Sequence, residues 1–297
     1  MSLPNFMCIG AAKSGTTTLY DILRQHPDIF LPSFKEPHFF DITENYNKGL
    51  DWYRKNYYSK TNKQTIGDFT PSYFFDTQSP RRIHASLGSG VRFVVLLRDP
   101  VDRAYSHYLH SLRDRHESLS FEDGLLIEKE RLELYVKNGD YLSYLRHSYC
   151  HQGFYGDMIK NYLDYFSIDN FFFIHFEKEF VQNREGTIIS LLEFLDLDKE
   201  IDLNINIKSN AASKERSQLL KNIMKSKGLW RQLIKRMIPN AQTRQIIRNK
   251  IQRVNIKEIK SSPLPDSLKS YLYDKYFRDN IETFEKLTKM KLEYYDN

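Results

Sequence analysis

Two segments of the chain contain residue types that bind phosphate groups. The first is residues 10–17, GAAKSGTT, which follow an apolar run and precede a helical pattern. In that setting the backbone N–H groups of a glycine loop and of the helix N-terminus can hold a phosphate. The second is Arg98, which directly follows the apolar run 91–97; its guanidinium pairs with phosphate through two hydrogen bonds and keeps its charge. Together they predict a site for a phosphate-bearing ligand that needs no metal ion.

The position of the lysine separates this loop from the loop of ATP-using enzymes. Gly10 and Gly15 have the spacing of the motif G-x-x-x-x-G-K-[ST], but Thr16 follows Gly15 and the lysine of the loop is Lys13. An ATP-using loop needs a lysine after the second glycine and a later strand that ends in a Mg²⁺-binding Asp. A nucleotide kinase or NTPase is therefore the disfavoured alternative, which Mg²⁺-dependent ATP turnover would reveal.

Strand and helix patterns alternate along the chain, which is typical of an α/β fold with a parallel sheet. The strongest strand pattern is 91–97, VRFVVLL, which is β-branched and almost wholly apolar, as a buried parallel strand should be. We expect one α/β domain with a helical C-terminal extension. The other predicted strands are 6–9, 65–69 and 171–175, and the predicted helices are 16–26, 102–112, most of 121–166, 187–195 and 266–287.

Composition excludes several classes of protein. The 297 residues are 40% hydrophobic, 28% charged and 14% aromatic, which is the balance of a folded soluble chain rather than of a collagen, a low-complexity segment or a disordered protein. No run approaches the roughly 18 apolar residues of a membrane span, and the N-terminus lacks a signal-peptide pattern. Cys8 and Cys150 form no disulfide or metal-binding pattern. We therefore expect no metal site, no transmembrane segment and a reducing, cytoplasmic location.

The basic charge of the chain is concentrated in one segment. Residues 214–260 contain 14 Lys or Arg against two Glu, a local charge of +12, whereas the whole chain carries +6. Within this segment, residues 229–238 place apolar side chains on one helical face and basic ones on the other. The segment is either a solvated helical face or a surface that contacts an anionic glycan or membrane. Because no base-reading motif is present, nucleic acid is not an expected partner.

Around these residues the sequence resembles the sulfotransferases that use 3′-phosphoadenosine 5′-phosphosulfate (PAPS). Residues 13–17 are similar to their loop for the 5′-phosphosulfate, and Arg98 with Ser106, eight residues later, is similar to their 3′-phosphate element. The likeness is greater to the heparan-sulfate-type carbohydrate sulfotransferases and their bacterial relatives, and it spans about residues 5–217. It is carried by residues 35–41 (KEPHFFD), 70–73 (TPSY), 153–155 (GFY) and 210–217 (NAASKERS).

The resemblance implies a fold and a reaction. The fold would be a P-loop-like three-layer sandwich, in which helices flank a central parallel sheet. It would form a single sulfotransferase domain over 1–297, with a core at about 5–217 and a basic helical extension at about 218–297. The reaction would be in-line transfer of a sulfuryl group from PAPS to a hydroxyl or amine of a carbohydrate or glycoconjugate acceptor, without a metal.

The same resemblance implies roles for individual residues. Because the acceptor loses a proton and the leaving 5′-phosphate gains charge, the site needs a base and a cation. Glu36 would be the general base, with His38 as its rival, and Lys13 the cation on the leaving phosphate. The implied PAPS-binding residues are Lys13, Ser14, Gly15, Thr16, Thr17, Arg98, Ser106, Lys214 and Arg216.

The sequence also departs from the family pattern. Residues 68–71, DFTP, stand where heparan-type relatives often carry Glu-Lys-Thr-Pro, so Phe69 replaces a lysine near the transferred group and leaves the acceptor class open. The cysteine-bridged loop, signal anchor and stem of the Golgi enzymes are missing, so the chain is more similar to a soluble bacterial member. A third alternative is a non-catalytic protein that binds polyanions through 214–260; its salt-sensitive binding would survive loss of Lys13 and Glu36.

Overall fold

A computed structural model of the chain describes residues 3–59, 61–207, 213–215, 256–258 and 262–295. The chain divides into two compact units, one of Met1–Ser209 with Leu264–Asn297 and one of Asn210–Pro263. The described part of the second unit is an antiparallel pair of strands, β6 (Ser213–Glu215) and β7 (Ile256–Glu258). The helix predicted over 229–238 lies outside the described residues, and the assignment of 1–297 to a single domain stays a prediction.

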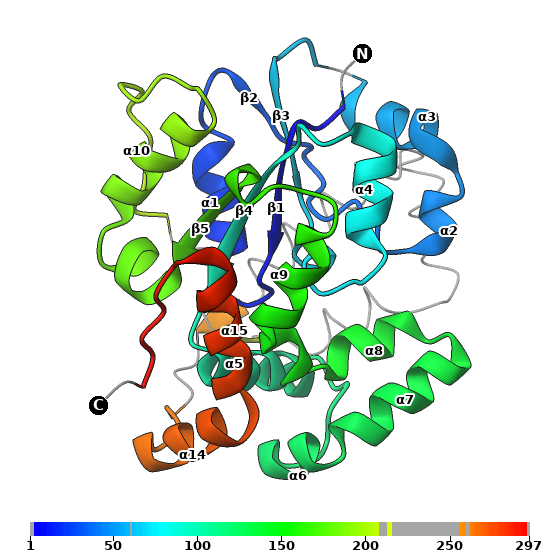
Figure 1. Cartoon of the computed structure of the whole chain (residues 1–297), viewed down its shortest axis with the longest axis vertical. Helices are drawn as coiled ribbons and strands as arrows, with labels where there is room; N and C mark the ends of the chain where they lie inside the picture. Colours follow the sequence, from blue (N-terminus) through cyan, green and yellow to red (C-terminus); the bar gives the residue numbers. More distant parts are fainter. Residues whose placement is uncertain (1–2, 60, 208–212, 216–255, 259–261, 296–297) are drawn as a thin grey trace. The chain divides into compact units, whose positions relative to one another are not determined.

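The first unit is built on a five-stranded parallel sheet with the strand order β2-β3-β1-β4-β5 (Figure 1). This confirms the predicted parallel sheet and its four predicted strands. The fifth, β2, is a two-residue edge strand, too short to produce a sequence pattern. The strands are β1 (Phe6–Gly10), β2 (Ile29–Phe30), β3 (Thr65–Phe69), β4 (Arg92–Leu97) and β5 (Phe171–His175).

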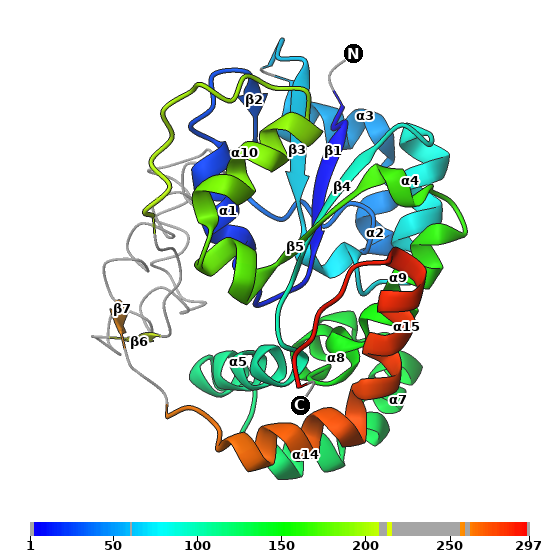
Figure 2. The same ribbon diagram turned by 60° about the vertical axis from the view of Figure 1, so that its left-hand side comes forward.

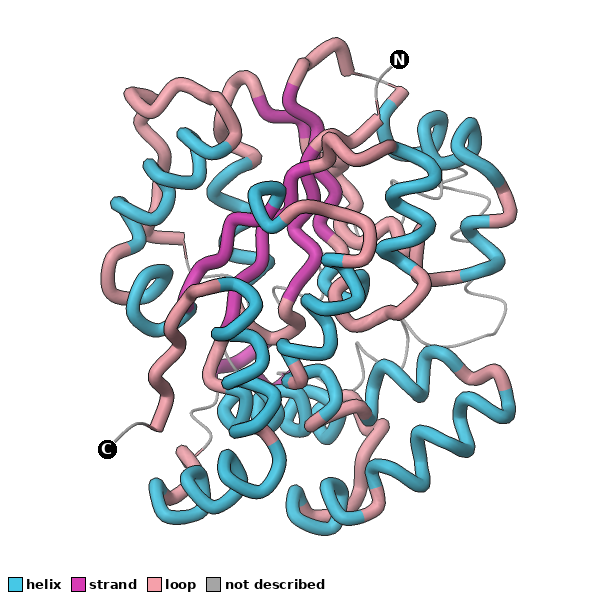
Figure 3. The backbone as a smooth tube through the Cα atoms, in the orientation of Figure 1, coloured by secondary structure: helices cyan, strands magenta, loops and turns pink. Residues whose placement is uncertain are grey.

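Helices cover both faces of the sheet and make three layers (Figures 1 and 3). Along β1, Met7 and Ile9 join the apolar cluster on one face, whereas Phe6 and Cys8 join the cluster on the other, as the alternation of a strand requires. The first cluster includes α4 (Ser79–Leu87), α9 (Tyr155–Leu163) and α15 (Arg278–Thr288), and the second includes α1 (Thr16–Leu23) and α10 (Arg184–Phe194).

The remaining elements surround these layers. The α-helices are α2 (Thr43–Tyr46), α3 (Gly49–Tyr53), α5 (Pro100–Arg113), α6 (Phe121–Leu126), α7 (Glu128–Asn138), α8 (Tyr141–His147) and α14 (Asp266–Tyr276). The short 3₁₀ and π turns are η1 (Arg54–Tyr58), η2 (Pro71–Tyr73), η3 (His151–Gly153), η4 (Ile168–Asn170) and η5 (Phe176–Val181). No helix in the described ranges is long and apolar enough to cross a membrane.

Helix α5 begins two residues earlier than predicted. Pro100 is its first residue, because a proline lacks the N–H that a first turn leaves unpaired. The side chain of Asp99 caps the helix and accepts hydrogen bonds from the N–H groups of Val101 (2.9 Å) and Asp102 (2.8 Å). The strand end at Arg98 is thereby joined directly to a capped helix.

The C-terminal helical region is part of the same core. The pattern over 266–287 predicts one helix, but the chain forms α14 and α15, which meet at Phe277. Phe277 is buried against Gly153, where an added Cβ would lie 2.8 Å from its ring. The side chain of Asn280 accepts a hydrogen bond from the N–H of Gly156 in α9 (2.6 Å). The break lets α15 lie along α9.

Candidate active site

The order of the strands places a topological switch point at the carboxyl end of β1, where open α/β sheets have their ligand crevice. The chain places β3 on one side of β1 and β4 on the other, and open α/β sheets bind their ligands outside the strand ends at such a switch point. The segments after β1, β3, β4 and β5 therefore converge there, and α5 starts beside the end of β4 (Figure 2).

The phosphate loop, residues 10–17, has the geometry of an anion site. Gly15 lies at the N-terminus of α1 with φ +88°, and no side chain caps the helix, so its first N–H groups point to the crevice. Ser14 is fully buried, and its hydroxyl has no hydrogen-bond partner among the described residues. A buried hydroxyl without a partner is unusual. A phosphate oxygen would supply that partner, so the loop fits a phosphate group.

Gly15 cannot be replaced without strain. Besides its positive φ, an added Cβ would lie 2.8 Å from the ring of Phe176 in η5. We expect Gly15→Ala to lower the melting temperature by several degrees and to weaken binding of adenosine 3′,5′-bisphosphate. Gly139→Ala is the matched control, because Gly139 has φ +67° but no atom within 4 Å of its Cβ position, so it carries only the backbone cost of about 1 kcal/mol. Equal melting temperatures of the two variants would contradict the crowding argument.

Arg98 is oriented toward the loop from the end of β4. Its Nη1 donates to the carbonyl oxygen of Lys13 (3.1 Å), and its guanidinium lies 5.3 Å from the ring centre of Phe176. Its Nε has no hydrogen-bond partner within the described part of the chain, and Glu177 Oε1 is 4.0 Å away. The guanidinium of Arg98 is thus held at one edge and leaves a donor for an anion. Ser106, the other residue predicted to bind the 3′-phosphate, is half-buried on α5.

The ammonium of Lys13 is in an environment of mixed charge. Burial, together with the positive charges of Arg113 and Arg98, lowers its pKa to about 8 against the opposing effect of Glu36. A lysine shifted in this way releases a proton more easily than usual. A phosphate bound beside Lys13 would stabilise its protonated form.

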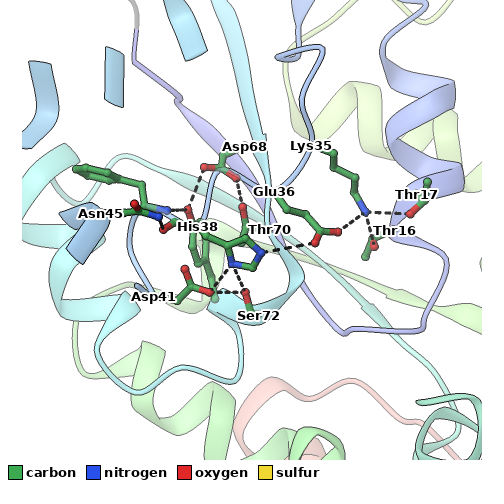
Figure 4. Close-up of polar contacts among 12 residues, drawn as sticks. Thr16, Thr17, Lys35, Glu36, His38, Asp41, Asn45, Asp68, Thr70 and Ser72 are labelled. Carbon is green, nitrogen blue, oxygen red and sulfur yellow. Dashed lines mark hydrogen bonds and ion pairs between the residues drawn. The ribbon is translucent and has the colours of Figure 1, made fainter. Parts of the chain in front are cut away.

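A second lysine lies at the phosphate loop. The ammonium of Lys35 donates to the hydroxyls of Thr16 (3.2 Å) and Thr17 (3.0 Å) and to Glu36 Oε1 (3.2 Å) (Figure 4). Its side chain is only 15% exposed, whereas that of Glu36 is 41% exposed. Lys35 therefore connects the loop to the candidate base, a contact that the sequence analysis did not predict.

Glu36 and His38 form the centre of a row of alternating charges. Both have positive φ, +66° and +50°, a backbone strain that often accompanies functional sites. The Nε2 of His38 lies 3.7 Å from Glu36 Oε2, and its Nδ1 lies 2.8 Å from Asp41 Oδ2 and 3.3 Å from the hydroxyl of Ser72 (Figure 4).

The charges of this row fix its protonation. Burial alone would raise the pKa of Glu36, but Lys35 and His38 hold it at about 2. Burial would lower the pKa of His38, but Asp41 and Glu36 raise it to about 10. At neutral pH, Glu36 is therefore an anion and His38 a cation, so that Glu36 rather than His38 has a free lone pair for an acceptor proton.

The pKa of His38 predicts a pH-dependent contribution to stability. Because the folded pKa of about 10 exceeds the ordinary value of 6.5, this contribution is complete below pH 6.5 and is lost as the pH rises toward 10. We expect the free energy of unfolding to fall less steeply over this range in Asp41→Asn than in the wild type, measured by urea denaturation. Ser72→Ala keeps the charge of Asp41 and should retain the wild-type slope. Equal slopes in wild type and Asp41→Asn would contradict the ion pair.

Asp68 fixes the segment that follows β3. It is buried, which raises its pKa to about 6, and it accepts hydrogen bonds from Thr70 (2.6 Å), Tyr53 (2.5 Å) and Tyr73 (3.2 Å). The next residue, Phe69, faces the opposite side of the sheet, where its ring packs on Phe6 and Tyr20. The position at which heparan-type relatives often have lysine is therefore an apolar core position in this chain.

Two other predicted site residues belong to the second unit. Lys214 belongs to β6 in the second unit, and Arg216 lies outside the described residues; their role stays a prediction. In the described ranges, no three His, Cys, Asp or Glu side chains gather as metal ligands would.

Sequence analysis missed three further residues of the site. Asp41 is buried and holds both His38 and Ser72, and the hydroxyl of Tyr141 in α8 lies 3.3 Å from its Oδ2. Phe176 packs on both Gly15 and Arg98. Lys35 and Asp41 stand within the motif KEPHFFD, which could have indicated them, but Phe176 has no sequence signal beyond its place after a strand.

A parallel sheet whose first strand leads into a glycine loop and a helix, with an arginine at the end of the neighbouring strand, defines an α/β protein of the phosphate-loop class. More specifically, the chain belongs to the sulfotransferase domain family, whose model matches residues 3–260.

Individual relatives agree with this assignment. The chain is 33% identical over 199 residues to heparan sulfate glucosamine 3-O-sulfotransferase 3B1 of Homo sapiens, which is 67% of this chain and 47% of that protein. It is 31% identical over 198 residues to heparan sulfate glucosamine 3-O-sulfotransferase 6 of Mus musculus. The matched region covers 67% of this chain and 54% of that protein. The chain thus spans about half the length of these curated relatives.

A solved structure shares the fold over nearly the whole chain. The sulfotransferase from Alicyclobacillus acidocaldarius superposes with a TM-score of 0.69 at 23% identity and covers 98% of each chain. At that identity the match shows the three-layer architecture, and it agrees with the predicted fold class.

Proposed function

We propose that the chain transfers the sulfuryl group of PAPS to a hydroxyl or amine of a glycan acceptor. The observation that carries this proposal is the joining of a phosphate loop to an ionised carboxylate: Lys35 contacts Thr16, Thr17 and Glu36 at once. Such an arrangement supplies donors for the leaving phosphate and an acceptor for the proton in one crevice.

The transfer needs each part of the site. The acceptor oxygen or nitrogen bonds to sulfur as the bond from sulfur to the bridging oxygen of the 5′-phosphate breaks. Glu36 takes the acceptor proton, and adenosine 3′,5′-bisphosphate leaves with the electron pair of the broken bond. Lys13, Ser14 and the N–H groups at Gly15 stabilise the charge that develops on the leaving phosphate. Arg98 and Ser106 hold the 3′-phosphate, and the binding of the nucleotide by Lys214 and Arg216 stays a prediction from the sequence.

The acceptor and the setting of the reaction are also part of the proposal. A glycan hydroxyl is supported by the curated relatives, which are named for 3-O-sulfation of heparan sulfate glucosamine. A reducing, cytoplasmic location is supported by Cys8 and Cys150, which are both buried and unpaired. The basic segment 214–260 is proposed to contact an anionic glycan or membrane surface.

Calorimetric titration with adenosine 3′,5′-bisphosphate, with and without EDTA, tests the donor. We expect tight binding that EDTA does not change, and transfer of ³⁵S from labelled PAPS to at least one of a panel of glycans. Binding of Mg-ATP in place of the bisphosphate would contradict the proposal and favour a kinase. Retention on heparin after neutralising Lys13 and Glu36, without ³⁵S transfer by the wild type, would favour a polyanion-binding protein.

A further inference from the structure

Lys35 occupies a place that a donor molecule must enter. Its ammonium has three N–H donors, and they are used on Thr16, Thr17 and Glu36. The two hydroxyls stand at the N-terminus of α1, where an anion would bind. Each hydroxyl accepts a hydrogen bond from Lys35 and still has its own proton to donate to a phosphate oxygen. A phosphate bound there would lie beside the ammonium of Lys35 and compete with Glu36 for its N–H donors.

Lys35 hydrogen-bonds both the loop hydroxyls and Glu36, and the other candidate cationic positions are placed differently. Phe69, at the position where heparan-type relatives often carry lysine, is buried in the apolar cluster beneath α1. Arg98 is engaged with the carbonyl oxygen of Lys13 and the ring of Phe176. Lys35 is thus the described cation that touches both the phosphate loop and Glu36.

We propose that Lys35 couples donor binding to the activation of the base: its ammonium moves from Glu36 to the phosphosulfate when the donor binds, and Glu36 is thereby released to accept the acceptor proton. This inference rests on the proposed function and assigns to Lys35 a role that the reaction scheme above lacks. It also gives an order to the reaction, since the base becomes effective only after the donor is in place.

Electrostatics gives the coupling a direction. A carboxylate with a pKa of about 2 is a weak base, and a general base works best when its pKa lies closer to the working pH. A phosphosulfate places new negative charge beside Lys35, and one ammonium shared between two anions stabilises each of them less. The pKa of Glu36 should therefore rise toward the ordinary value when the donor binds.

Other charged groups that face Glu36 limit the size of this rise. His38 stays positive because Asp41 also holds it, and Lys13 and His110 interact with Glu36 from the loop and from α5. Lys35 and His38 are the cations that contact Glu36, and because the positive charge of His38 persists, the change on donor binding falls mainly on Lys35.

The carboxyl carbon of Glu36, observed by NMR after ¹³C labelling of glutamate and assigned by its loss in Glu36→Gln, reports this coupling directly. Between pH 7 and pH 4 we expect no titration in the ligand-free wild type. With adenosine 3′,5′-bisphosphate bound, protonation should begin within that range. In Lys35→Met it should begin there without nucleotide, and nucleotide should add little. Lys35→Arg keeps the charge and should restore a response to nucleotide.

Kinetics provides a second readout. Lys35→Met is expected to lower kcat roughly 10²-fold, the loss typical of one group that stabilises developing charge, and to move the acidic limb of the pH profile to higher pH. Lys35→Arg should recover part of kcat. Lys55→Met, which removes an exposed lysine of η1, is the control and should match the wild type.

The outcomes separate this inference from the proposed function. Failure of the bisphosphate to bind the wild type would overturn the proposed donor. Binding that leaves the signal of Glu36 unchanged between pH 7 and pH 4 would overturn the role of Lys35 alone. A signal that responds to nucleotide equally in wild type and Lys35→Met would also overturn it, because the response would then come from another group.

Discussion

Glu36→Gln is expected to lower kcat by roughly 10²–10⁴-fold, the range for loss of a general base, and to leave the affinity for adenosine 3′,5′-bisphosphate nearly unchanged. The amide keeps the size of the side chain and an oxygen for Lys35, but it cannot take a proton from the acceptor. Single-turnover transfer of ³⁵S from PAPS gives the chemical step, and calorimetry gives the dissociation constant of the nucleotide.

The split between the two measurements identifies the role of Glu36. Glu44→Gln, which removes one negative charge from an exposed position of α2, is the control and should retain wild-type kcat. If Glu36→Gln weakened nucleotide binding as much as it lowered kcat, then Glu36 would be holding Lys35 and the loop in place and would not be the base. A fall in kcat for His38→Gln with Glu36→Gln unaffected would transfer the role to His38.

Arg98→Ala should weaken the binding of the nucleotide, which Glu36→Gln leaves nearly unchanged. A charged hydrogen bond contributes about 1.5–3 kcal/mol, so the affinity for adenosine 3′,5′-bisphosphate should fall about 10- to 150-fold. The affinity for adenosine 5′-monophosphate, which lacks the 3′-phosphate, should change little. Calorimetric titration of each nucleotide into wild type and variant measures both effects.

A matched arginine distinguishes a specific contact from general charge. Arg24 follows the last residue of α1, has half of its side chain exposed and pairs with Asp21 (3.9 Å), so Arg24→Ala removes the same charge at a distance from the end of β4. Both nucleotides should bind this control as they bind the wild type. Equal weakening of the two nucleotides by Arg98→Ala would show that Arg98 supports the loop through the Lys13 carbonyl and does not bind the 3′-phosphate.

The central strands were predictable because burial on both faces leaves a clear signal. β4 and β5 are short runs of apolar residues, and β1 ends at the glycine that opens the phosphate loop. The edge strand β2 has no such run. The break between α14 and α15 has no proline or glycine to mark it, because it depends on how Phe277 packs against Gly153. That contact joins residues far apart in sequence, so no local pattern can contain it.

The same difference between local sequence patterns and long-range contacts applies to the candidate site. Lys13, Gly15 and Arg98 follow strands directly, so the fold determines where they lie once the strands are recognised. The pairing of Lys35 with Thr16 and of His38 with Asp41 depends on the path of an irregular loop. Positive φ at Glu36 and His38 is equally invisible in a sequence, because the side chains on either side do not require it. The charged groups that set the pKa values of Glu36 and His38 are therefore brought together only in the folded chain.

The packing of α14 and α15 has a consequence for synthesis on the ribosome. Phe277 covers Gly153, Asn280 binds the N–H of Gly156, and the Nε2 of His175 donates to the carbonyl oxygen of Leu292 (2.9 Å). All five strands of the sheet are translated before these partners exist. Until residue 292 emerges, the nascent polypeptide exposes an apolar surface on α9 and leaves the end of β5 unsecured, which is the kind of intermediate that chaperones bind and that aggregates. Folding of this unit thus requires the chain up to residue 292, even though its phosphate loop is made early.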